Sequence, residues 1–239
     1  MYCLQPRFEG EQQSYKSLEA LAADYVQDIR LIQPEGPYFL GGECLGGMIA
    51  FEMAQQLQVQ GQKVATLILL DTFAQATAIW RLSYSIDRLL QISRLAYHLR
   101  KFIQLRSGGE KLAYLASKSK IVYARIIFKL RRLLSRLFFT PTPPNEELTK
   151  HYEFEHYIEI VRSYSPRPYP HQIALLVSEA TYQQNPTLGW NHIARGGLHV
   201  YRVPGNHYSI LREDFQTTFQ QLRTCLEAAQ AKETTSWVT

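Results

Sequence analysis

The chain has 239 residues, enough to bury one substantial core, and its 46% hydrophobic and 20% charged residues are ordinary for a folded domain. This balance excludes a wholly disordered chain, and no apolar run approaches the ~20 residues that a membrane-spanning helix requires. The first residues lack the basic-then-apolar order of a signal peptide, so we expect a cytoplasmic protein.

The formal charge of +5 is unevenly distributed along the chain. Twelve Lys or Arg residues and a single acid, Glu110, lie between Arg94 and Arg136, whereas the rest of the chain is net acidic. Such a stretch predicts a local basic surface that suits an acidic partner.

The first part of the chain alternates between strand and helix patterns. Its helices carry apolar side chains at helical spacing, and its last strand is apolar on both faces. The predicted elements are, in order, a strand at 1–5, a helix at 17–31 with Ser17 as N-cap, a strand at 38–40, a helix at 45–60 and a strand at 64–70. The strand–helix–strand order predicts a right-handed parallel crossover.

The second part begins with a long helical stretch. Residues 76–140 are helical in pattern throughout, and a further helix is predicted at 146–161. Strands then return at 173–177 and 198–203, before a closing helix at 212–229. We therefore predict an α/β fold with a mostly parallel sheet and an inserted all-helical lid. The predicted parts are a first core segment at 1–75, the lid at 76–163, a second core segment at 164–231 and a frayed tail at 232–239.

The segment Gly42-Glu43-Cys44-Leu45-Gly46-Gly47 has the G-x-nucleophile-x-G pattern and lies between a predicted strand and a predicted helix. A nucleophile in this position occupies a strained turn, and small residues two before and two after it let the strand and the helix pass closely. The helix N-terminus then faces the reacting atoms, so the backbone N–H of Leu45 is the predicted oxyanion donor. The same helix end favours a thiolate at Cys44.

Two further residues lie at the same edge of the predicted sheet. Asp71 follows the strand at 64–70, and His207 lies in a turn just after the strand at 198–203. The chain order of nucleophile, acid and histidine is that of the α/β hydrolases. In this arrangement His207 takes the thiol proton and Asp71 orients the imidazole.

Each of these residues also has a simpler interpretation. Asp71 can be a turn or helix-capping residue, His207 a loop histidine and Cys44 a small buried hydrophobe. Their positions at three matching element ends favour the catalytic set. The other cysteines, Cys3 and Cys225, are expected to pack as free thiols, and their spacing predicts neither a disulfide framework nor a metal site.

Several longer strings resemble the thioesterase domains that terminate nonribosomal peptide and polyketide synthetases. They cover most of the chain apart from the basic helical middle. They are Gln33-Pro-Glu-Gly-Pro-Tyr-Phe-Leu-Gly-Gly-Glu-Cys-Leu-Gly-Gly, Phe51-Glu-Met-Ala, Leu69-Leu-Asp-Thr, residues 164–173, Pro186-Thr-Leu-Gly-Trp, Arg195-Gly-Gly-Leu and Val203-Pro-Gly-Asn-His.

By this resemblance Cys44, Asp71 and His207 fall on the triad positions of the family. The implied reaction is transfer of an acyl or peptidyl chain from a carrier-bound phosphopantetheine thioester to the enzyme, followed by release through water or an internal nucleophile. The chain is expected to need no cofactor of its own, because the partner carries the phosphopantetheine. The acyl substrate, and the choice between hydrolysis and cyclisation, are left open by the sequence.

The sequence departs from the family pattern in two places. Cys44 stands where most members have serine, and a cysteine acyl-enzyme is a thioester that favours transfer to an amine or cyclisation. The family's preceding strand, with its His-Pro-Gly-Gly-like loop, has no counterpart before residues 2–7. We therefore expect the first central strand and one oxyanion donor to be missing, and loss of one such donor typically costs about 10²–10³ in rate.

The basic stretch from Lys118 to Arg136 has apolar residues at helical spacing and suggests an amphipathic lid helix. A solvated lid face, a docking surface for an acidic carrier domain and a membrane-surface contact are the alternatives. We expect a carrier protein to dock near it, and we do not expect a membrane partner. Nucleic acid is not an expected partner either, because no recognised nucleic-acid-binding fold accompanies the charge.

Two competing functions remain. Dienelactone hydrolases use a similar Gly-x-Cys-x-Gly-Gly turn, although the long lid and the Leu-Gly-Trp and Pro-Gly-Asn-His strings favour the thioesterase. A non-catalytic carrier-binding remnant is the third interpretation, because the oxyanion hole is expected to be incomplete.

Overall fold

The computed structural model describes residues 2–4, 15–74, 100–104, 107–114, 116 and 157–235. The chain divides into two compact units. The first unit contains Met1–Leu4, Tyr15–Ala78 and Ile158–Thr239, and the second contains Gln5–Ser14 and Ile79–Tyr157. Most of the predicted lid lies outside the described residues, so its extent stays a prediction.

A four-stranded sheet forms the centre of the first unit. Its strands are β1 (Tyr38–Glu43), β2 (Val64–Leu70), β3 (Ile173–Ser178) and β4 (Leu198–Val203). They lie in the order β1-β2-β3-β4, and all three pairings are parallel. This arrangement confirms the predicted α/β fold class, and it brings the carboxyl ends of all four strands to one edge.

The strand predicted at 1–5 is wrong for the residues that can be assessed. Residues 2–4 are not in a strand, and Tyr2 is 74% exposed, so this segment has no buried face to hold it against the sheet. The expected packing of Cys3 is also wrong, because Cys3 is exposed. Within the described part of the chain, β1 is therefore an edge strand.

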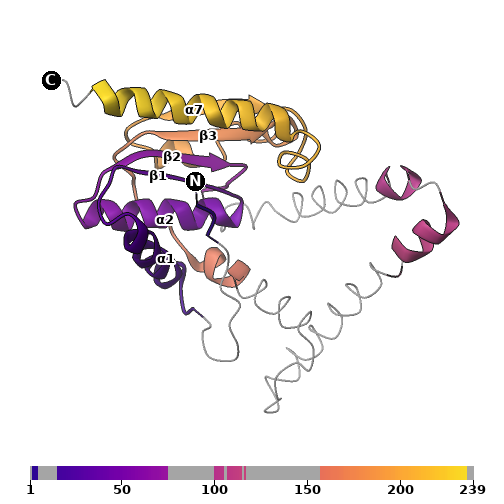
Figure 1. Cartoon of the computed structure of the whole chain (residues 1–239), viewed down its shortest axis with the longest axis horizontal. Helices are drawn as coiled ribbons and strands as arrows, with labels where there is room; N and C mark the ends of the chain where they lie inside the picture. The colour runs from indigo at the N-terminus through magenta and orange to yellow at the C-terminus, as the bar shows by residue number, and fades with distance from the viewer. Residues whose placement is uncertain are drawn as a thin grey trace, which may run out of the picture. The chain divides into compact units, whose positions relative to one another are not determined.

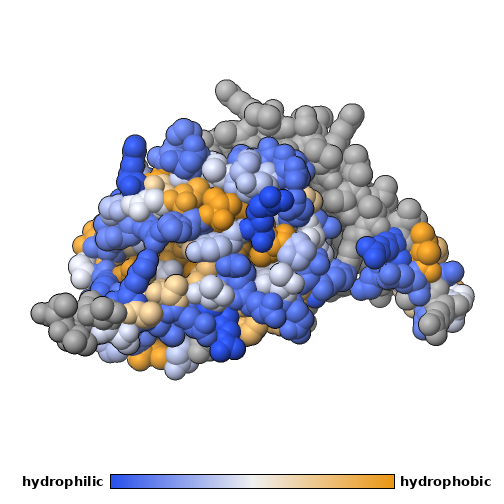
Figure 2. All heavy atoms as spheres, turned by 90° about the horizontal axis from the view of Figure 1, so that it is seen from above, coloured by the Kyte–Doolittle hydropathy of each residue, from blue (hydrophilic) through white to orange (hydrophobic). Residues whose placement is uncertain are grey.

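Helices cover both faces of the sheet (Figure 1). The helix α2 (Leu45–Val59) packs against β1 and β2, and α1 (Leu18–Ile32) packs on α2. The helix α7 (Phe215–Thr235) contacts β2, β3 and β4 on the opposite face. Figure 2 views this second face, which is mostly hydrophilic with separate apolar patches.

The ends of the helices are close to the predicted ones. Ser17 is the N-cap of α1, as predicted, and its hydroxyl accepts from the Ala20 N–H at 3.3 Å. The closing helix α7 begins three residues later than predicted and continues to Thr235. The helix predicted at 146–161 can be assessed only from 157, and it ends at residue 163.

Two short elements were not predicted. They are α6 (Glu179–Tyr182), which follows β3 at once, and the 3-10 turn η1 (Trp190–His192). The Trp190 indole N–H donates to the carbonyl of Thr72 at 2.6 Å, which fixes the segment just after β2. Among the described residues, no helix has both the length and the apolar character needed to span a bilayer.

Candidate active site

The turn between β1 and α2 holds Cys44 in an unusual backbone conformation. Its φ and ψ are 52° and −115°, a region that side chains rarely adopt and that recurs at functional sites. The Cys44 N–H donates to the carbonyl of Leu70 at 3.0 Å, so the turn is tied to the end of β2. Cys44 is half-buried, as suits a side chain presented at the edge of the sheet.

The glycines of this turn allow strand and helix to approach. A Cβ at Gly42 would collide with the backbone of Gly46 and Gly47, as the sequence pattern predicts. A Cβ at Gly46 would meet nothing, whereas one at Gly47 would collide with Thr72. The prediction that position 46 needs a small side chain is therefore wrong. The close approach is between the backbone of Gly46 and position 42, so it is Gly42 that must lack a Cβ.

Asp71 lies directly after β2 and is completely buried. Its φ is 39°, so it too adopts a backbone conformation that side chains rarely take. Its carboxylate accepts at Oδ1 from the Ser178 N–H at 2.8 Å and at Oδ2 from the Ser178 hydroxyl at 2.6 Å. The Thr181 hydroxyl is 3.3 Å from the same Oδ2. The interpretation of Asp71 as a simple helix cap does not account for these contacts.

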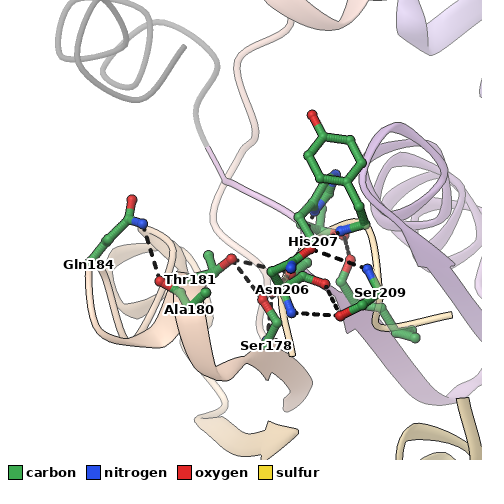
Figure 3. A network of polar contacts seen from close by, with 11 residues as sticks. Ser178, Ala180, Thr181, Gln184, Asn206, His207 and Ser209 are labelled. Carbon is green, nitrogen blue, oxygen red and sulfur yellow. Dashed lines mark hydrogen bonds and ion pairs between the residues drawn. The ribbon is translucent and has the colours of Figure 1, made fainter. Parts of the chain in front are cut away.

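His207 lies in the turn after β4, and Figure 3 shows this turn beside Ser178 and Thr181. Its Nδ1 is 3.5 Å from Asp71 Oδ2. The turn is braced locally, because Asn206 Oδ1 accepts from the Tyr208 N–H at 2.9 Å and Ser209 Oγ accepts from the Asn206 N–H at 2.9 Å. The imidazole is thus held in place against a buried carboxylate.

The electrostatics of His207 reflect two opposing effects. Burial by itself lowers the pKa of an imidazole, but hydrogen bonding to Asp71 and to Cys44 outweighs it and raises the pKa of His207 to about 11. The imidazole therefore contacts the carboxylate and the thiol together. Burial also raises the pKa of Glu43. The charges of His207, Asp71 and Arg212 have smaller effects on it, so Glu43 interacts electrostatically with the site.

The structure thus brings together the three side chains predicted from the sequence. Cys44, Asp71 and His207 come from three strand ends and meet at the carboxyl edge of the sheet. Leu45 is the first residue of α2, and the first N–H groups of a helix have no partner within it. Cys225 is buried in α7, as predicted.

The sequence reasoning missed Ser178 and Thr181, which surround the Asp71 carboxylate. Ser178 closes β3, and a polar residue at the end of the neighbouring parallel strand was a usable signal. In the described part of the chain, no three His, Cys, Asp or Glu side chains are grouped so that they could hold a metal ion.

Several known proteins are similar to this chain. A family model of the thioesterase domain matches residues 1–112. The dimodular nonribosomal peptide synthase of Bacillus subtilis (strain 168) is 46% identical over 74 residues, which are 30% of this chain and 3% of that protein. Atromentin synthetase of Tapinella panuoides is 24% identical over 230 residues, 90% of this chain and 23% of that protein. The chain therefore spans only a small part of the length of these relatives.

Solved structures show the same fold. The NocB thioesterase domain from the nocardicin cluster has a TM-score of 0.59 and 23% identity, covering 93% of this chain and 79% of that chain. The SrfTE thioesterase domain, described in the cyclization of the lipopeptide surfactin, has a TM-score of 0.51 and 21% identity, covering 86% of this chain and 74% of that chain.

The fold and the site define an α/β-hydrolase-like chain with a cysteine at the turn after the first strand of its sheet. Over residues 1–112 the chain is similar to the thioesterase-domain family. The predicted resemblance to the thioesterase domains of nonribosomal peptide and polyketide synthetases is confirmed by the family model and by these relatives.

Proposed function

We propose that this chain transfers an acyl or peptidyl group from the phosphopantetheine thioester of a carrier protein to Cys44, and then releases it. The observation that carries the proposal is the position of His207, whose imidazole contacts both the Asp71 carboxylate and the Cys44 thiol. The match of residues 1–112 to the thioesterase-domain model supports a thioester as substrate.

The acylation step uses these three side chains. Because Nδ1 of His207 faces Asp71, its Nε2 is the nitrogen that holds the proton taken from the Cys44 thiol, and the raised pKa of His207 favours this pair of imidazolium and thiolate. The Cys44 sulfur then bonds to the thioester carbonyl carbon, and the carbonyl oxygen becomes an oxyanion near the Leu45 N–H. Collapse of this intermediate breaks the bond between carbon and the pantetheine sulfur, which leaves with the proton held by His207.

Release follows by the reverse use of the same groups. His207 accepts a proton from water, or from a hydroxyl or amine of the bound chain, as that group attacks the Cys44 thioester. A thioester is more reactive toward amines than an oxygen ester is, so a cysteine here favours cyclisation or transfer to an amine. Exclusive formation of the free acid in the presence of an amine acceptor would contradict this preference.

The chain supplies no cofactor in this scheme, because the phosphopantetheine belongs to the carrier protein. We place the carrier's docking site near the basic stretch between Arg94 and Arg136, whose excess of Lys and Arg suits an acidic surface. Most of this stretch lies outside the described residues, so the support comes from its charge. A binding constant that weakens with added salt is the expected sign of such docking.

The direct test is incubation of the purified chain with an acyl-phosphopantetheinyl carrier protein, followed by intact-protein mass spectrometry. We expect an acyl adduct on the wild-type chain and none on Cys44→Ala. The matched control is Cys225→Ala, which removes a buried thiol of α7 and should leave the adduct unchanged. Turnover of lactones but not thioesters would favour the dienelactone hydrolase, and carrier binding without any adduct would favour the non-catalytic remnant.

A further inference from the structure

The Asp71 carboxylate is held more closely by Ser178 than by the histidine it faces. Ser178 supplies two donors, its backbone N–H to Oδ1 at 2.8 Å and its hydroxyl to Oδ2 at 2.6 Å. His207 Nδ1 lies 3.5 Å from the same Oδ2. One residue therefore engages both oxygens of the carboxylate and leaves Oδ2 facing the imidazole.

The fold explains why Ser178 reaches Asp71 from so far along the sequence. The Asp71 N–H donates to the carbonyl of Leu176 at 2.9 Å, and this continues the parallel pairing of β2 and β3 past the end of β2. Ser178 is the last residue of β3, so it lies beside Asp71 at the carboxyl edge. It is fully buried there.

The hydroxyl of Ser178 does not cap the short helix that follows it. Ser178 is the N-cap residue of α6, where serine normally accepts a hydrogen bond from the helix backbone. Its side chain makes no such capping bond. The hydroxyl is directed at Asp71 instead, which indicates that the residue serves the carboxylate rather than the helix.

Thr181 completes the arrangement. A hydroxyl has one proton, and the 2.6 Å contact with Asp71 takes that of Ser178. The two hydroxyl oxygens lie 2.8 Å apart, and Thr181 Oγ1 lies 3.3 Å from Asp71 Oδ2, so Thr181 is within hydrogen-bond distance of both Ser178 and the carboxylate. Ser178 and Thr181 lie side by side (Figure 3), and both hydroxyls are close to the Asp71 carboxylate.

We propose that Ser178 is a positioning residue that fixes the plane of the Asp71 carboxylate so that Oδ2 steadies the His207 imidazole, with Thr181 as its support. Ser178 touches neither the thiol nor the substrate in this scheme. Its effect on the rate passes through Asp71 and His207. This inference rests on the proposed function only for the measurement of Cys44 acylation, because the His207 titration needs no substrate.

The test compares Ser178→Ala with the wild-type chain in two measurements. The first is an NMR titration of the His207 imidazole, which needs no substrate. We expect its pKa to fall toward the ordinary value, because the freed carboxylate no longer holds a fixed orientation. The second is the pH profile of Cys44 acylation, in which we expect a loss of about tenfold, the effect of one hydrogen bond to a charged group, and a high-pH limb moved to lower pH.

Two variants control this comparison. Ser178→Thr keeps the hydroxyl and should restore both the titration and most of the rate. Ser163→Ala removes a hydroxyl that bonds the carbonyl of Ile160 at 2.9 Å, and it should change neither. If Ser178→Ala does not fold, Thr181→Val removes the supporting hydroxyl alone and should move the His207 titration in the same direction by a smaller amount.

An unchanged His207 titration in Ser178→Ala, or in Thr181→Val if that variant has to be used, would overturn the positioning role. A wild-type chain that forms no acyl adduct would defeat the proposed function instead. The titration would then still decide the role of Ser178, so the two failures can be told apart.

Discussion

At the residue scale, Cys44 and Asp71 share a backbone feature. Both have positive φ angles, 52° and 39°, although neither is glycine. Such conformations cost about 1–3 kcal/mol each and persist where the surrounding structure enforces them. Here Cys44 is tied to Leu70 and Asp71 to Leu176 through backbone hydrogen bonds. Among the described residues, Leu188 is the third non-glycine residue with a positive φ, so two of the three such residues have side chains that contact His207.

The raised pKa of His207 predicts how stability depends on pH. The folded-state value of about 11 lies above the ordinary 6.5, so the imidazolium favours the folded state. This contribution is complete below about pH 6.5, decreases as the pH rises, and is lost above about pH 11. We expect the stability difference between wild type and His207→Gln, measured by urea unfolding, to shrink steadily across this range. A difference that stays constant with pH would contradict the assignment.

At the element scale, the packing of α2 on the sheet requires glycine at position 47 but not at position 46. A Cβ at Gly47 would collide with the side chain of Thr72, whose hydroxyl already donates to the Leu70 carbonyl at 3.0 Å. We expect Gly47→Ala to lower the free energy of unfolding by about 1–3 kcal/mol, as overpacking of a core does. Urea unfolding measures this change.

Gly46→Ala is the matched control, because it lies in the same turn of the same helix and its Cβ would meet nothing. Alanine is the better helix former by about 1 kcal/mol, so this variant should be as stable as the wild type or more stable. Equal losses in both variants would show that helix α2 is sensitive to any substitution there.

The elements that could be predicted from the sequence were those with an uninterrupted local pattern. The run Val64–Leu70 is apolar except for Thr66 and forms β2 over those same residues. The apolar residues near the N-terminus failed as a predictor, because residues 2–4 have no buried face. Ser178 directly follows the strand predicted at 173–177, but its contact with Asp71, 107 residues away, depends on the pairing of β2 with β3, which no local pattern specifies.

At the scale of the whole molecule, the site joins two distant segments of the chain. Cys44 and Asp71 belong to the segment that forms β1 and β2, and His207 belongs to the segment after β4. Away from the site, the first segment also contacts the residues before β3, where the Tyr164 hydroxyl donates to the buried Glu52 carboxylate of α2 at 2.5 Å. The imidazole meets the thiol only when both segments are assembled on one sheet.

The central claim is that His207 activates Cys44 in the folded chain, and competitive alkylation tests it most directly. At about pH 6, iodoacetamide should modify Cys44 on the order of tenfold faster than the exposed Cys3 of the same chain, since the thiolate is the reacting form. In His207→Gln this advantage should disappear. A Cys44 that reacts no faster than Cys3, or one that keeps its advantage without His207, would contradict the account.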